Sequence, residues 1–98
     1  MAIVMIMHWP EVTPELYDAA REGVGWEEDA PLGGRGHVAW FKDDGLHVVD
    51  VWDTAEAFET FVQERLMPVV KGELGIPGEP RVRIFPAHRQ FVPEAITA

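Results

Sequence analysis

Short runs of apolar residues, each closed by turn residues, divide the chain into strands and helices. Residues 2–8 form one continuous apolar run that ends at Trp9-Pro10. A run of this length closed by a proline favours a strand buried on both faces over a helix. Further apolar runs predict strands at residues 37–41, 46–52 and 81–85. Because proline cannot donate a ladder hydrogen bond, Pro86 predicts that the last strand lies at an edge of the sheet or contains a bulge.

Two other segments carry apolar residues at helical spacing. In the first, Thr13 suits the N-cap position and Pro14 the first helical position. Gly23 or Gly25 is expected to end this helix, since glycine readily adopts the left-handed conformation of a C-cap.

The second helix is predicted to begin at Asp53, which forms a capping box with Glu56. Pro68 interrupts its apolar pattern because proline lacks the N–H that an inner helical turn requires. A kink is therefore expected at Pro68, or a restart into a second segment that reaches Leu74.

The predicted order β-α-β-β-α-β is that of the split βαβ, or ferredoxin-like, plan. This α+β plan has a four-stranded antiparallel sheet with both helices on one face, and we expect residues 1–98 to form one such domain. All four predicted strands nevertheless carry apolar residues on both faces. The face without helices therefore needs another cover, and pairing with a second copy of the chain supplies it most economically.

The second and third strands are joined by residues 42–45, Lys-Asp-Asp-Gly, a strong hairpin signal. With the turn centred on Asp43-Asp44, His37 lies directly opposite Asp50. With the turn at Asp44-Gly45, the two residues become diagonal neighbours. They share one face in both registers because side chains alternate along a strand.

The hairpin has one mixed face and one almost purely apolar face. The mixed face carries His37, Ala39, Phe41, Leu46, Val48, Asp50 and Trp52. The other carries Val38, Trp40, Val49 and Val51. Because helices cover apolar surface, we assign the purely apolar face to the helices.

The pair His37 and Asp50 is the strongest candidate for acid–base chemistry. A carboxylate beside an imidazole orients the ring, fixes its tautomer and favours its charged form, which prepares a histidine for proton transfer. The alternative is a hydrogen bond that only satisfies two buried polar groups. Around the pair, the candidate substrate-binding residues are Trp52, Phe41, Trp9, His8 and His88.

A metal site built from His8, His37, Asp50 and His88 would have suitable ligand types. No two of them have a local ligand spacing such as HxH or HExxH, so neither a metal nor another cofactor is expected. Haem or metal binding through His8, His37 or His88 stays a lesser alternative.

Composition narrows the range of partners. With 17 acidic and 8 basic residues, the net charge of −9 should repel nucleic acid and anionic membrane surfaces, so neither is expected as a partner.

There is no cysteine, which excludes disulfides and thiolate chemistry. The longest uncharged apolar run, residues 1–7, is far shorter than the ~20 residues of a membrane span. A cytoplasmic location is expected.

The chain resembles the dimeric α+β-barrel superfamily over nearly its whole length. The residues that carry the resemblance are 36–39 (Gly-His-Val-Ala), 45–52 (Gly-Leu-His-Val-Val-Asp-Val-Trp), 57–58, 61–62, 64–66, Pro68 and 85–88 (Phe-Pro-Ala-His). The last of these looks like the closing segment of small actinobacterial-type members. The resemblance implies two ferredoxin-like protomers that pair their open sheet faces. Members include antibiotic-biosynthesis monooxygenases, polyketide cyclases, muconolactone-type isomerases, haem enzymes and stress-responsive proteins.

Three functional hypotheses follow. The favoured one is a cofactor-independent cyclase, isomerase or monooxygenase that acts on a small aromatic or polyketide-like molecule. In it, His37 is the general acid or base, Asp50 orients the ring, and Trp52, Phe41 and Trp9 shape the pocket. The second hypothesis is a non-catalytic dimer that binds a hydrophobic ligand or serves a structural role. The third is the haem- or metal-binding barrel.

Overall fold

A computed structural model describes residues 1–93 of the chain. Its elements follow one another as β1 (Ile3–Trp9), α1 (Pro14–Val24), β2 (Gly34–Lys42), β3 (Gly45–Trp52), α2 (Ala55–Phe61), η1 (Val62–Leu66), η2 (Pro68–Glu73) and β4 (Arg81–Pro86). This is the predicted order, with strand ends shifted by at most three residues. The tail, residues 91–98, is only weakly specified by its sequence, and residues 94–98 lie outside the described residues.

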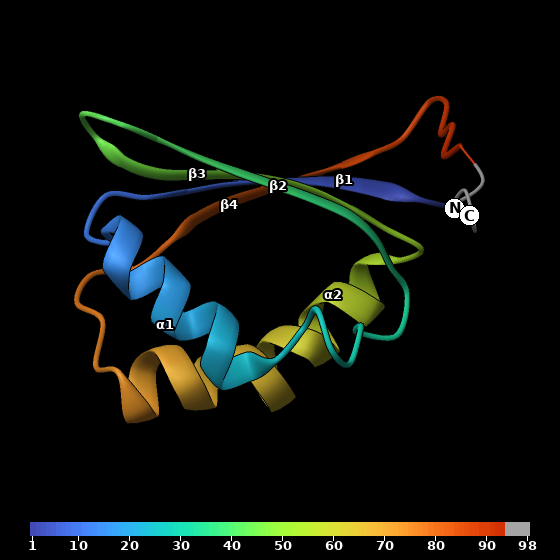
Figure 1. Ribbon diagram of the computed structural model, residues 1–98. Helices are drawn as coiled ribbons and strands as arrows, with labels where there is room; N and C mark the ends of the chain where they lie inside the picture. Colours follow the sequence, from blue (N-terminus) through green and yellow to red (C-terminus); the bar gives the residue numbers. More distant parts are fainter. Residues whose placement is uncertain (94–98) are drawn as a thin grey trace.

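The strands form an antiparallel sheet in the order β2-β3-β1-β4, and all the helical segments lie on one side of it (Figure 1). This is the ferredoxin-like arrangement that the sequence predicts. β4 is an edge strand, as Pro86 indicated. Among the described residues, no helix is long and apolar enough to cross a lipid bilayer.

The β2–β3 hairpin has the first of the two predicted registers, with Phe41 opposite Leu46 and His37 opposite Asp50. Gly45 sets the turn, and its φ of 103° lies in the region that favours glycine. A Cβ atom at this position would also lie 2.5 Å from the carbonyl oxygen of Pro10. The end of the hairpin is thereby packed tightly against the end of β1.

The caps of α1 were predicted correctly, and the N-cap of α2 was not. Thr13 caps α1 by accepting a hydrogen bond from Leu16 N at 3.2 Å, and Gly25 ends this helix with a φ of 71°. The prediction for α2 was wrong by one residue: Thr54, not Asp53, is the N-cap and accepts from Ala57 N. Asp53 instead forms a two-pronged ion pair with Arg35, which occupies both of its carboxylate oxygens at 2.8 Å.

The predicted irregularity at Pro68 takes the form of two wide, π-helical segments, η1 and η2, on either side of Met67. The amide of Met67 donates to the carbonyl of Val62, five residues earlier, instead of four. Proline has no N–H and its ring clashes with the carbonyl one turn back, so the backbone widens here rather than forming regular α-helical turns. The helical layer therefore continues past Pro68 to Glu73.

The assignment of the sheet faces was wrong. The helices cover the mixed face of the hairpin, where Leu46, Val48, Asp50 and Trp52 are all buried. The purely apolar face is open in the single chain, with Val38 62% exposed. Apolar content could not distinguish the faces, because both are apolar and the polar groups of the mixed face find partners in the helical layer. We call the uncovered side, which carries Val38 and Trp40, the open face.

Candidate active site

Four side chains form a continuous hydrogen-bonded row between the sheet and the helices. The hydroxyl of Tyr17 in α1 lies 2.7 Å from Nε2 of His37 in β2. Nδ1 of His37 lies 2.6 Å from Oδ1 of Asp50 in β3. The indole N–H of Trp52 donates to the other carboxylate oxygen of Asp50 at 3.1 Å. We call these four residues the polar row.

Chemistry fixes the direction of most of these bonds. An ionised carboxylate only accepts, so Nδ1–H of His37 donates to Asp50. In the neutral ring, Nε2 then carries the lone pair and accepts from the hydroxyl of Tyr17. If His37 takes a second proton, Nε2–H donates to the Tyr17 oxygen instead. The contact therefore holds in both charge states of the imidazole.

The polar row runs from a half-open end to a buried end. The side chain of His37 is 34% exposed and that of Asp50 only 10%. Asp50 is the buried charged residue of the described chain, and both of its oxygens accept hydrogen bonds. Since a buried carboxylate is stable only with such partners, Trp52 and His37 together explain how an aspartate is tolerated in this core.

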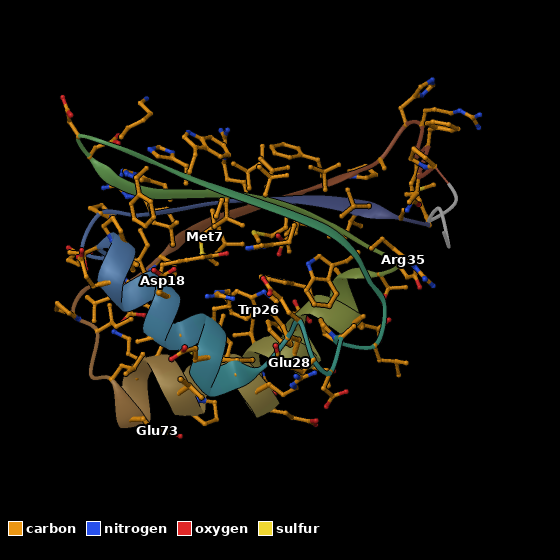
Figure 2. The ribbon with its side chains drawn as sticks, in the orientation of Figure 1. Met7, Asp18, Trp26, Glu28, Arg35 and Glu73 are labelled. Carbon is orange, nitrogen blue, oxygen red and sulfur yellow. The ribbon has the colours of Figure 1, made fainter. Side chains whose placement is uncertain are left out.

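The row forms part of the wall of a cavity of about 220 Å³ that is otherwise mainly apolar. Apolar lining residues from the sheet include Met5, Met7, Trp9, Leu46 and Val48, and those from the helical layer include Phe58, Phe61, Leu66 and Val70. Met7 and Trp26 both lie in the layer between sheet and helices (Figure 2). An apolar chamber with a few convergent polar groups is the usual form of a small-molecule site.

Tyr17 is held in its protonated form. Burial raises the pKa of its phenol above the ordinary value of 10.0, and the negative charges of Glu27 and Asp50 raise it further. A phenol with a raised pKa keeps its proton at neutral pH, so its O–H stays in place as a hydrogen-bond donor. Tyr17 can therefore pass a proton between a bound molecule and His37 while remaining neutral.

Trp26, in the loop after α1, closes the polar end of the cavity. Its ring centroid lies 5.4 Å from that of His37 and 5.8 Å from that of Tyr17. Arg65 in η1 fixes both ends of this part of the loop, donating to the carbonyls of Val24 at 3.2 Å and of Asp29 at 2.7 Å. The wide turns of η1 thus help to position an aromatic wall of the site.

Of the predicted substrate-binding residues on this side of the sheet, two line the cavity and one does not. Trp9 and Trp52 line the cavity, and the indole N–H of Trp9 donates to the carbonyl of Pro77 at 3.0 Å. Phe41 does not line the cavity. Its ring packs edge-on against Tyr17 with a centroid distance of 6.2 Å, so it helps to fix the position of the phenol ring.

The structure does not bring His8 and His88 to this site. His8 alternates with the cavity-lining Met7 and Trp9 along β1, so its side chain lies on the open face. His88 follows Pro86, which pairs with Ile3 at the opposite end of β1 from His8. The four residues considered as a metal set therefore lie in three separate places, because parity and register separate them.

Sequence reasoning missed Tyr17 and Trp26 as site residues. Tyr17 belongs to the apolar stripe of α1, where a tyrosine needs a partner for its hydroxyl. Because the helices were assigned to the other face of the sheet, no strand residue was expected near this hydroxyl. Trp26 lies in a loop whose path no periodic pattern describes.

Comparison with solved structures finds the same fold over almost the whole chain. A mutant of SnoaB, a cofactor-independent oxygenase from Streptomyces nogalater, matches with a TM-score of 0.63 and 18% identity over 95% of this chain and 98% of that chain. The monooxygenase from the gene ActVA-Orf6 of Streptomyces coelicolor, in complex with nanaomycin D, matches with a TM-score of 0.59 and 18% identity over 94% and 91%.

A hydroxynitrile lyase from Passiflora edulis matches with a TM-score of 0.58 and 10% identity over 93% of this chain and 97% of that chain. These likenesses show the fold alone, the ferredoxin-like α+β arrangement described above. No family model matches the sequence, and no curated protein matches it significantly. Because chains of this fold include both oxygenases and a lyase, the fold alone does not identify the reaction.

Proposed function

We propose that the protein is a cofactor-independent acid–base enzyme that removes a proton from a small aromatic or polyketide-like substrate. The observation that carries this proposal is the 2.6 Å contact between His37 and Asp50 in the wall of an apolar cavity. Packing alone does not require an imidazole and a carboxylate there. Their pairing prepares a base whose charged form is stabilised by the neighbouring carboxylate.

In the proposed step, Asp50 retains the hydrogen bond from Nδ1–H and stabilises the imidazolium that forms. Nε2 of His37 receives a proton from the Tyr17 hydroxyl as the substrate passes its own proton to the Tyr17 oxygen. The substrate loses a proton from a carbon next to a carbonyl or from a phenol. The Trp52 N–H holds the far oxygen of Asp50, so the carboxylate keeps its orientation throughout.

The cavity favours a flat, mostly apolar molecule. Its volume of about 220 Å³ and its aromatic and aliphatic walls suit a compact ring system. The resulting carbanion or enolate can close a ring, move a double bond or react with dioxygen. In the last case a ring CH₂ group and O₂ give a carbonyl group and water, and dioxygen is the oxidant. The two oxygenases among the similar structures favour this outcome.

A second candidate function is binding without turnover. It is favoured by the completeness of the polar row: in residues 1–93 no buried side-chain nitrogen or oxygen lacks a hydrogen-bond partner. Nε2 of His37 already has Tyr17 as a partner, and a merely structural pair would look the same. Ligand binding without turnover would distinguish this candidate from the enzyme.

We further propose that the working form is a homodimer formed through the open face. Val38 and Trp40 are 62% and 41% exposed on a face where β1 and β3 also carry Val4, Ile6, Val49 and Val51. Burying such a face against a second copy removes apolar surface from water, which favours association by about 25 cal/mol per Å² before the costs of binding.

A thermal-shift screen tests the site. The wild type, His37→Ala and His88→Ala are screened against anthrones, quinols, lactones and polyketide-like acids, followed by oxygen uptake and product analysis with any hit. A ligand at 100 times its dissociation constant adds about 2.7 kcal/mol to the free energy of unfolding. We expect a hit that His37→Ala weakens and His88→Ala does not. A hit bound equally by all three proteins would contradict the proposed site, and a hit without turnover would favour the binding protein.

A further inference from the structure

A second cluster of ionisable groups lies on the open face, on the other side of the sheet from the cavity. His8 in β1 and His47 in β3 are directly opposite each other in the strand register. Their rings are stacked, with centroids 4.5 Å apart and planes 12° apart. Asp44, in the turn between β2 and β3, lies beside both rings. We call these three residues the His–Asp–His cluster.

The potential ligand atoms of the cluster already converge. Nε2 of His47 donates to Oδ1 of Asp44 at 2.8 Å, while Nε2 of His8 lies 3.5 Å from Oδ2 and donates to the Asp44 carbonyl at 2.8 Å. One ligand atom from each residue can be chosen so that all lie within 4.8 Å of one another. The Asp44 side chain is 51% exposed, so a hydrated ion can reach the cluster from solvent.

We propose that the His–Asp–His cluster binds one divalent transition-metal ion, with zinc, cobalt, nickel and copper as the suitable class. Two imidazole nitrogens and one carboxylate oxygen are the ligands that these ions prefer, whereas calcium and magnesium prefer oxygen alone. Three protein ligands leave a position for water or for a group from another molecule. The site is independent of the proposed proton abstraction, since parity puts it on the opposite side of the sheet from the cavity, and it shares the open face with the proposed dimer interface.

The surroundings hold the ligands in place. Trp40 stacks on His47 with centroids 5.4 Å apart and planes 15° apart, which orients the ring. The close contact between Gly45 and Pro10 fixes the turn that carries Asp44 against the end of β1. Metal binding then requires two changes. Both rings tilt so that their Nε2 lone pairs point at one ion, and the proton on each Nε2 moves to Nδ1 or is released to solvent.

Two nearby positive charges oppose binding. Lys42 at the end of β2 acts electrostatically on the carboxylate of Asp44. Arg81 of β4 is the register partner of His8, so both side chains lie on the open face. The positive charge of Arg81 weakens the attraction for a cation. Within residues 1–93, Arg81 makes no hydrogen bond to the ligand atoms, so they stay accessible to the ion. We therefore expect moderate affinity rather than the tight binding of an enclosed structural site.

The test is a metal titration of the full chain, purified without a histidine tag and treated with a chelator. Zinc binding is measured by calorimetry, and cobalt binding by the visible absorption that distinguishes tetrahedral coordination. The variants are His8→Gln, His47→Gln and Asp44→Asn, with His37→Gln and His88→Gln as matched controls. Thermal unfolding without metal shows whether each variant still folds.

We expect one zinc ion per chain and a tetrahedral cobalt spectrum. His8→Gln and His47→Gln should each weaken zinc binding by about tenfold or more, whereas both controls should bind like the wild type. Either of two results overturns the proposal. One is no zinc binding by the wild type at a hundredfold molar excess over the chain. The other is binding that persists unchanged in folded His8→Gln and His47→Gln.

Discussion

The hydroxyl of Tyr17 lies 2.7 Å from Nε2 of His37, on the side of the ring opposite Asp50. An α-helical residue and two strand residues thereby form one path along which a proton can move. The path begins at a half-exposed edge and ends at a buried carboxylate. The helix that carries Tyr17 is thus part of the site as well as a cover for the sheet.

The first prediction concerns the ionisation of Tyr17. It is the single tyrosine of the chain, so the ultraviolet absorbance of phenolate reports on it alone. Its pKa should lie above 10.0, because burial and then Glu27 and Asp50 disfavour the phenolate. Glu27→Gln should lower this pKa and Glu79→Gln should not. A wild-type value at or below 10.0 would contradict the described environment.

The same raised pKa fixes the sign of a stability change. The folded chain holds the phenolic proton more tightly than the unfolded chain, so the contribution of Tyr17 is fully present below pH 10.0. It is lost as the pH rises from 10.0 through the folded-state pKa. Urea unfolding of wild type and Tyr17→Phe across this range should show the wild type losing stability more steeply. Parallel pH profiles would count against this linkage.

A second prediction concerns the far end of the polar row. Trp52→Phe removes the N–H that Asp50 accepts and leaves a buried carboxylate oxygen without that donor. The expected loss is about 1–3 kcal/mol of unfolding free energy, measured by urea denaturation. Trp40→Phe is the matched control on the open face, where the residue is 41% exposed, and should cost less. Equal losses in the two variants would show that the hydrogen bond contributes little.

The third prediction concerns self-association. Val38→Glu puts a charge on the open face and should convert the proposed dimer to a monomer in sedimentation velocity experiments. Leu32→Glu is the control, because Leu32 is 94% exposed in the loop before β2 and outside that face. A wild type that sediments as a monomer, or a Val38→Glu variant that still dimerises, would exclude this interface.

The sequence predicted the fold well because its local signals are strong. The hairpin turn and the alternation of the strands were enough to put His37 and Asp50 on one face, although two registers stayed open, and Thr13 and Pro14 were enough to start α1. These features depend on contacts close in sequence or on a single hairpin register. The order of elements then left the ferredoxin-like plan as the natural arrangement.

The side of the sheet that the helices cover could not be predicted in the same way. That choice depends on how the whole helical layer packs, and on whether Tyr17 and Trp52 can satisfy His37 and Asp50. The error mattered for the site, because it separated His37 from Tyr17 and Trp26. It also concealed that His8 faces away from the cavity, toward Asp44 and His47.

Proton abstraction by His37 is the central claim, and deuterium exchange tests it without depending on the later reaction. Anthrone is incubated in deuterated water without dioxygen, with wild type, His37→Gln or His88→Gln, and exchange at its acidic CH₂ group is followed by NMR. We predict that the wild type and His88→Gln accelerate exchange and that His37→Gln does not. Exchange accelerated equally by wild type and His37→Gln would contradict the claim that His37 is the base.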